Sequence, residues 1–105
     1  MTEHDIQNLI RVMASKYGVC FRANVGHVKL PDGRYFDTGL PKGFPDLFCV
    51  IQGRAAFIEV KKPGGCVSPE QEKVHAILRK HGAHVAVCYS VDDAEKFILN
   101  EVLKT

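Results

Sequence analysis

Residues 43–62 read GFPDLFCVIQGRAAFIEVKK, which is two apolar runs separated by the dipeptide Gln52-Gly53. A short turn between two apolar runs predicts a β-hairpin, and a two-residue turn fixes which residues face each other across it. In that register the opposite pairs are Ile51 with Arg54, Val50 with Ala55, Leu47 with Ile58, and Asp46 with Glu59.

The last of these pairs, Asp46 and Glu59, brings two acids together. Residues directly opposite each other in antiparallel strands lie ~5 Å apart, and like charges at that distance are destabilising. Lys61 follows Glu59 by two residues, so it lies on the same face of the strand. We therefore expect a divalent-metal site with a lysine beside it. In the alternative interpretation, Asp46 only begins a strand and Glu59 forms a surface ion pair with Lys61 or Arg54.

The composition is that of a globular chain, since 46% of the 105 residues are hydrophobic and 25% are charged. This length predicts one domain covering residues 1–105. The formal net charge of +2 is compatible with a nucleic-acid partner without requiring one. The four cysteines form no CxxC pair, and neither a signal peptide nor an apolar run of ~20 residues is visible. We expect free thiols, no membrane span and an intracellular, cytoplasmic protein.

Apolar periodicity and turn residues predict further elements on both sides of the hairpin. In chain order they are a helix over 3–17, strands over 19–24, 28–30 and 34–36, the hairpin, a helix between Ser68 and Gly82, a strand over 84–89 and a helix after Ser90. A helical crossover joins the second hairpin strand to the strand over 84–89. We therefore expect an α/β fold with a mixed β-sheet flanked by helices and the core order α-β-β-β-α-β-α. In the helix after Ser68, the expected apolar stripe is Val74, Ile77, Leu78 and His81.

Three motifs together resemble a known family of enzymes. They are Gly43-x-Pro45-Asp46-Leu47, Glu59-Val60-Lys61 and Ser68-x-x-Gln71. Their combination is similar to the PD-(D/E)XK nuclease superfamily, and within it to the VRR-NUC branch, which occurs as stand-alone phage proteins and as a domain of larger repair nucleases. The dipeptide Pro31-Asp32 serves as a control, because no Glu-x-Lys follows it at hairpin spacing, and we interpret it as an ordinary turn.

The resemblance implies a restriction-endonuclease-like core and a DNA endonuclease that depends on Mg²⁺ or Mn²⁺. It implies these roles: Asp46 and Glu59 as carboxylate ligands, the Val60 carbonyl as a third ligand, Lys61 as the residue that orients or deprotonates the attacking water, Gln71 as a helix residue lining the site, and Glu3 as an additional ligand. The small stand-alone members resemble archaeal Holliday-junction resolvases, which implies a homodimer acting on branched DNA, as in DNA repair.

Several of these residues also have a purely structural interpretation. Gln71 completes a capping box with Ser68, and Glu3 is an acid in the first turn of a helix, where the helix dipole favours it. The five histidines lack the spacing of metal ligands, and most are expected at the surface or at helix ends. The candidate DNA contacts are Arg22, Asn24, Lys42 and Lys62.

Two functions of different class remain open from the sequence. The first is the structure-selective DNA endonuclease. The second is a nucleic-acid-binding module with a non-catalytic metal site, although the intact set of Asp46, Glu59 and Lys61 argues against it. A nuclease of flaps, duplex ends or RNA with the same chemistry is a third possibility.

Overall fold

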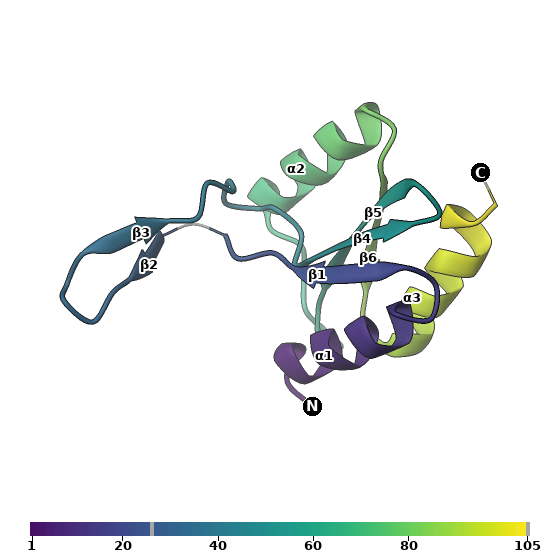
Figure 1. Cartoon of the computed structure of the whole chain (residues 1–105), viewed down its shortest axis with the longest axis horizontal. Coiled ribbons are helices and arrows are strands. Elements are labelled where there is room, and N and C mark those ends of the chain that lie inside the picture. Colours follow the sequence, from purple (N-terminus) through teal and green to yellow (C-terminus); the bar gives the residue numbers. More distant parts are fainter. Residues whose placement is uncertain (26, 105) are drawn as a thin grey trace.

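The computed structural model describes residues 1–25 and 27–104, with backbone alone for residues 27 and 28. Ten elements follow one another along the described chain (Figure 1). They are α1 (Glu3–Ala14), β1 (Val19–Arg22), β2 (His27–Lys29), β3 (Tyr35–Asp37), β4 (Leu47–Ile51), β5 (Arg54–Val60), α2 (Pro69–Lys80), β6 (His84–Cys88), α3 (Val91–Phe97) and the π-helical turn η1 (Ile98–Val102).

The β4–β5 hairpin forms in the register that the sequence predicts. Gln52 and Gly53 have φ angles of 50° and 78°, and two residues with positive φ are what a tight two-residue hairpin turn requires. Ile51 pairs with Arg54, and Leu47 pairs with Ile58. Asp46 directly precedes the first of these strands, and Glu59 lies near the end of the second. The hairpin thus brings the two candidate acids to one end of the sheet.

A mixed four-stranded sheet in the order β1-β4-β5-β6 forms the centre of the molecule. β1, β4 and β5 are antiparallel neighbours, and β6 joins β5 in parallel after the crossover through α2. Helices α1 and α3 pack on one face of this sheet, and α2 lies on the other (Figure 1). The predicted α/β class, the mixed sheet and the core order are therefore confirmed.

The main core lies between the sheet and the helices α1 and α3. Alternate residues of β4 and β5 point into it, as the two-residue period of a strand requires. Apolar residues of α3 and η1 are also buried in this core. The core side chains include Ile10, Met13, Leu47, Ile51, Ile58, Val60, Phe97, Ile98 and Val102.

β2 and β3 pair only with each other and form an arm outside the main sheet. The sequence predicts this small hairpin around Pro31-Asp32, but not that it projects from the globular body, as Figure 1 shows. Tyr35 and Phe36 on the arm are 68% and 57% exposed. The chain that leads from β1 into the arm leaves the sheet beside Asp46, since the Ala23 amide donates a hydrogen bond of 2.8 Å to the Asp46 carbonyl.

The apolar stripe expected on α2 is wrong in part, because Val74 and Leu78 are half-buried but Ile77 and His81 are not. Ile77 is 58% exposed and His81 is exposed, whereas His75 is the buried residue of this helix. The residues that reach the sheet are instead Gln71, His75 and Arg79, which are four residues apart and therefore share one face of the helix. The helix is rotated about its axis relative to the orientation that its apolar residues predict.

Candidate active site

Glu59 is a buried acid at the centre of the site, with 1% of its surface exposed. Its neighbours Ile58 and Val60 point into the main core, so Glu59 points to the other face of the sheet, towards α2. A carboxylate removed from water in this way requires hydrogen-bond partners.

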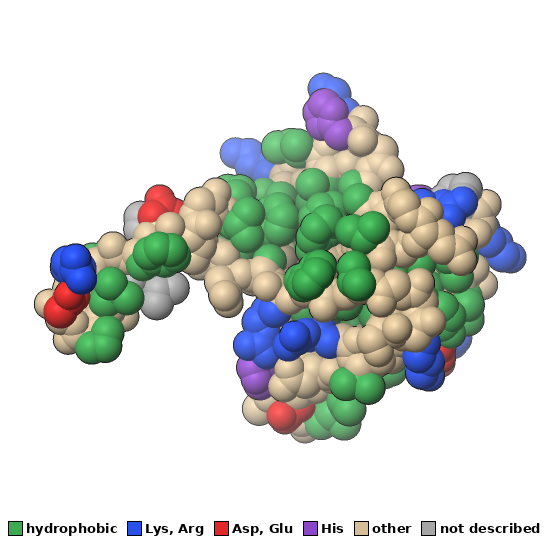
Figure 2. Space-filling model, viewed as in Figure 1, with side chains coloured by type: hydrophobic (Ala, Val, Ile, Leu, Met, Phe, Trp, Pro, Cys, Tyr) green, Lys and Arg blue, Asp and Glu red, His purple; other side chains and the backbone are tan. Residues whose placement is uncertain are grey.

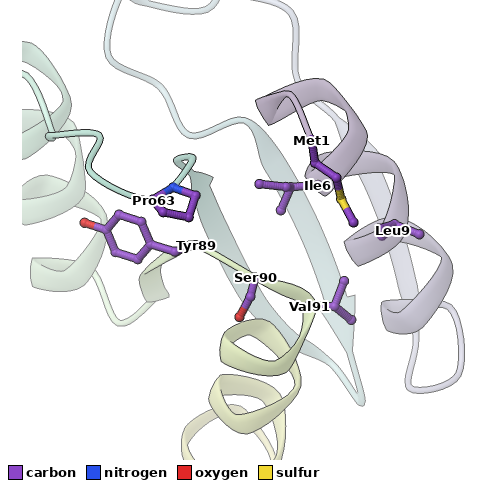
Figure 3. Close-up of a pocket in the computed structure, with 7 residues that line it drawn as sticks. All are labelled: Met1, Ile6, Leu9, Pro63, Tyr89, Ser90 and Val91. Atoms are coloured by element: carbon purple, nitrogen blue, oxygen red, sulfur yellow. The ribbon is translucent and has the colours of Figure 1, made fainter.

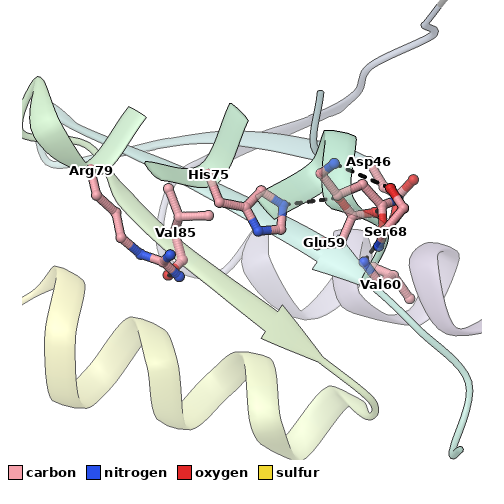
Figure 4. A network of polar contacts seen from close by, with 8 residues as sticks. Asp46, Glu59, Val60, Ser68, His75, Arg79 and Val85 are labelled. Atoms are coloured by element: carbon pink, nitrogen blue, oxygen red, sulfur yellow. Dashed lines mark hydrogen bonds and ion pairs between the residues drawn. The ribbon is translucent and has the colours of Figure 1, made fainter. Parts of the chain in front are cut away.

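Two side chains of α2 contact the two oxygens of this carboxylate. Gln71 Nε2 donates a hydrogen bond of 3.2 Å to Oε2, and His75 Nε2 lies 3.1 Å from Oε1. Figure 4 shows His75 pointing along the sheet at Glu59, and Arg79 one turn further on reaching the Val85 carbonyl. Both oxygens of Glu59 are therefore held by one helix.

Gln71 satisfies both interpretations that the sequence left open. Its side-chain Oε1 accepts a hydrogen bond of 2.9 Å from the backbone amide of Ser68. Its backbone amide donates a hydrogen bond of 3.2 Å to Ser68 Oγ, and the two bonds form a complete capping box. The side-chain Nε2 of Gln71 donates a hydrogen bond to Glu59. The capping box thus fixes the carboxamide in the orientation that contacts the acid.

Asp46 reaches the same point from the other strand of the hairpin. Its Oδ2 accepts a hydrogen bond of 2.7 Å from the Val60 amide (Figure 4). The chain approaches Asp46 through Gly43, which has a φ of 95°. A Cβ atom at Gly43 would lie 2.4 Å from the Glu70 carbonyl oxygen, so only glycine allows this close contact with the first turn of α2.

The two acids are electrostatically coupled. Burial, followed by a hydrogen bond and charge repulsion from Asp46, raises the pKa of Glu59 to about 9. The positive charge of Lys61 acts in the opposite direction, whereas Glu3 adds to the increase. A second negative charge at this point is therefore unfavourable unless a cation accompanies it.

This donor set fits a divalent cation that keeps part of its water shell. Within the described residues, no group of three or more His, Cys, Asp or Glu side chains is arranged to hold a metal. Mg²⁺ commonly takes only one or two carboxylates from a protein and retains several waters. Asp46 and Glu59 are the two carboxylates that could serve as such ligands, and the Val60 carbonyl beside them remains a predicted third.

Lys61 and Glu3 lie next to this pair. Lys61 is half-buried, and its charge lowers the pKa of Glu59. The Glu3 carboxylate accepts a hydrogen bond of 3.4 Å from the Lys62 amide, which turns it towards the end of β5. The role of Glu3 as a ligand stays a prediction, because this hydrogen bond joins it to the backbone and not to Asp46 or Glu59.

The candidate DNA contacts surround this end of the sheet. Arg22 faces α1, where Nη2 donates 3.1 Å to Asn8 Oδ1 and lies 3.3 Å from His4 Nε2. Lys42 is 3.9 Å from Glu70, and the side chains of Asn24 and Lys62 are exposed. In the described part of the chain, the Nε atoms of Arg11 and Arg22 are buried without a hydrogen-bond partner.

His75 is the residue that the sequence did not single out. Most of the histidines are expected at the surface or at helix ends, but His75 is 2% exposed. Burial, and after it the Arg79 guanidinium, lower the pKa of His75, which favours a neutral imidazole. Its position one helical turn after Gln71 is the signal that could have identified it, because residues four apart share a helix face.

An apolar pocket lies elsewhere, where the start of α1 meets the start of α3 (Figure 3). Its volume is about 270 Å³, and none of the candidate catalytic residues lines it. The lining residues are Met1, Ile6, Leu9, Pro63, Tyr89, Ser90 and Val91.

The PD-(D/E)XK class of nucleases is defined by a mixed sheet with an acid before one hairpin strand and Glu-x-Lys at the end of the next. A crossover helix follows these strands, as α2 does here. The family model of the VRR-NUC domain matches residues 1–92, and the chain belongs to this family. Nucleases of the family act on DNA and typically need a divalent metal.

Solved structures agree with this assignment at the level of the fold. One, described as "VRR_NUC domain", is 24% identical with a TM-score of 0.69, and the match covers 96% of this chain and 98% of that one. Another, a "VRR_NUC domain protein", is 21% identical with a TM-score of 0.69 and coverages of 94% and 89%. A search of curated proteins finds no match. Among the described helices, none is both long and apolar enough to cross a membrane.

Proposed function

We propose that this protein is an endonuclease that uses Mg²⁺ or Mn²⁺ to hydrolyse phosphodiester bonds in branched DNA such as Holliday junctions. The observation that supports it best is the coupled pair of Asp46 and Glu59. Burial and repulsion from Asp46 raise the pKa of Glu59 to about 9, so the pair is poorly arranged for a protein without a cation. A divalent ion held by Asp46 and Glu59 would supply the positive charge that lowers the barrier to phosphodiester hydrolysis.

The remaining residues have distinct roles in this proposal. Lys61 lies on the same face as Glu59 and orients or deprotonates the attacking water. Gln71 fixes Glu59 through the hydrogen bond of 3.2 Å, and the Val60 carbonyl and Glu3 complete the ligand set. In this division of roles, the residues of the chain hold the ion and position the attacking water, and such positioning lowers the barrier to a reaction.

We propose that the basic and amide side chains at this end of the sheet contact the phosphates of the DNA backbone. Arg22 contacts Asn8 and His4, neither of which is an acid, so its positive charge is available to a phosphate. Asn24 follows it at the base of the arm. Lys42 and Lys62 lie beside the start of α2 and the end of β5 and provide the other contacts.

The homodimer belongs to the same proposal. Figure 2 shows hydrophobic side chains gathered over β1 and β4. Val19, Phe21 and Val50 on these strands are 50%, 56% and 36% exposed, which supports a contact with a second copy. Free cysteines in the described chain agree with a cytoplasmic location.

One set of assays tests the proposed activity. Labelled Holliday junction, flap, linear duplex and RNA are incubated with Mg²⁺, with Mn²⁺ and with chelator, and the molar mass is measured in parallel. We expect metal-dependent, symmetric nicking of the junction by a dimer. Loss of a residue that only supports a metal ligand costs up to about 100-fold. Asp46→Asn and Glu59→Gln change the proposed ligands themselves, so each should reduce the rate at least about 100-fold.

The control replaces an exposed acid, Glu101→Gln, and should leave the rate unchanged. Junction binding without metal-dependent nicking would instead identify a binding module with a non-catalytic metal site. Equal cleavage of all substrates would identify a less selective nuclease, and wild-type rates in both acid variants would exclude the proposed site.

A further inference from the structure

Glu59 is fixed from behind by a single helix. The contacts of Gln71 and His75 occupy one oxygen each, at 3.2 Å and 3.1 Å. Each carboxylate oxygen has a second lone pair, so these hydrogen bonds leave a position on the acid open for a cation. The plane of the carboxylate is set by α2 before any ion arrives.

We propose that His75 is a positioning residue that holds Glu59 in the orientation required for metal binding. This inference rests on the proposed function, because it concerns the metal affinity of the same site. A carboxylate that binds a metal is ionised and has no proton to give, so His75 Nε2 carries the hydrogen and donates it to Oε1. Hydrogen bonds of this kind orient ligands and strengthen metal sites.

The burial of His75 distinguishes this contact from an incidental one. His75 is the buried residue of α2, and 2% of its surface is exposed. The imidazole therefore has little freedom to leave Glu59 for water. Its alternative role would be to fill space between α2 and the sheet, and an apolar ring of similar shape would then serve equally well.

Two substitutions separate hydrogen bonding from packing. His75→Phe keeps an aromatic ring without a donor, and His75→Gln keeps an N–H donor on a flexible chain. The matched control is His81→Gln, which changes an exposed histidine at the end of the same helix. His75→Leu is a second apolar variant in case the larger ring prevents folding.

The measurement is the dissociation constant of Mn²⁺ by calorimetry or by electron paramagnetic resonance, with melting temperatures of the metal-free proteins. We expect His75→Phe and His75→Leu to weaken Mn²⁺ binding about 10- to 100-fold. His75→Gln should recover much of the affinity, and His81→Gln should match the wild type. The difference between Phe and Gln should persist where their melting temperatures are equal.

Each result bears on a specific claim. Wild-type Mn²⁺ affinity in the folded apolar variants would overturn the positioning role and leave the proposed nuclease intact. Equal weakening in the Gln and Phe variants would also overturn it, because the donor would then not matter. A wild-type protein that neither binds Mn²⁺ nor cleaves DNA would refute the proposed function and this inference together.

Discussion

In the metal-free protein, two conditions act on Glu59 in the same direction. Its side chain is removed from water, which favours the protonated acid, and it lies beside Asp46, which favours it further. The free energy of the folded protein is highest when this acid is ionised and no cation is present. Binding of a cation offsets the free-energy cost of ionising Glu59.

The metal-free protein should therefore lose stability as the pH rises. The pKa of Glu59 is raised from 4.5 to about 9 on folding, so between these values the folded state holds a proton that the unfolded state has released. Stability falls with pH wherever the folded state binds more protons. Melting temperatures in chelator from pH 5 to pH 9 should fall in the wild type and much less in Glu59→Gln.

Glu101→Gln is the control for this series, since it removes an exposed acid. Its melting curve should follow that of the wild type. Parallel curves for the wild type and Glu59→Gln would show that Glu59 is not the acid responsible.

Asp46 and Glu59 could be predicted from the sequence because the two-residue turn left one register for the hairpin. His75 could not, for a physical reason. The orientation of α2 was inferred from its apolar residues, whereas a buried acid on the sheet selects polar partners. Gln71 was found by its motif, and its dual contact with Ser68 and Glu59 appears only in three dimensions.

α2 makes polar contacts with the sheet along one stripe of its surface. Gln71 and His75 bind Glu59, and Arg79 Nη2 donates a hydrogen bond of 3.1 Å to the Val85 carbonyl. Such contacts are directional, so they set the rotation of the helix more strictly than apolar packing does. This accounts for the exposure of Ile77, which the apolar pattern placed in the core.

Substitution of Ile77 tests this orientation of α2. Ile77 is 58% exposed, and alanine favours helices, so Ile77→Ala should change the free energy of unfolding by no more than about 0.5 kcal/mol. Ile10 is fully buried on α1, and Ile10→Ala should cost about 2–5 kcal/mol. Denaturant unfolding measures both. A cost for Ile77→Ala close to that of Ile10→Ala would place Ile77 in the core after all.

Gly43 and Gly82 lie against the two ends of α2 and differ in one respect. Both have positive φ, at 95° and 89°, but a Cβ at Gly82 meets nothing within 4 Å, whereas a Cβ at Gly43 meets the Glu70 carbonyl. Gly82→Ala should cost about 1–2 kcal/mol from backbone strain. Gly43→Ala should cost at least about 1 kcal/mol more, because the first turn of α2 must move.

Denaturant unfolding compares the two variants, and hydrogen exchange locates the change. Faster exchange confined to the first turn of α2 is expected in Gly43→Ala. Equal costs for both glycines would mean that the close contact with Glu70 is relaxed in solution.

Across the whole molecule, the sequence predicted the topology more fully than the shape. The hairpin turn and the helical crossover predict that β5 lies beside both β4 and β6, whereas the pairing of β1 with β4 appears only in the structure. The arm projects because β2 and β3 do not pair with the strands of the main sheet, and no local sequence pattern predicts that. A two-stranded hairpin is marginally stable alone, and Tyr35 and Phe36 of the arm stay exposed to solvent.

The net charge of +2 is too small to direct the whole surface towards DNA, so the position of each positive charge matters. Arg22 adjoins the site, whereas Lys96 lies on α3 and pairs with Asp92 at 2.9 Å. Each phosphate contact adds about 0.9 to the slope of log affinity against log salt concentration. Arg22→Gln should lower this slope by about that amount for a four-way junction, and Lys96→Gln should leave it unchanged, although both remove one charge. Titrations at several salt concentrations measure the slopes, and equal slopes for the two variants would show that Arg22 contacts no phosphate.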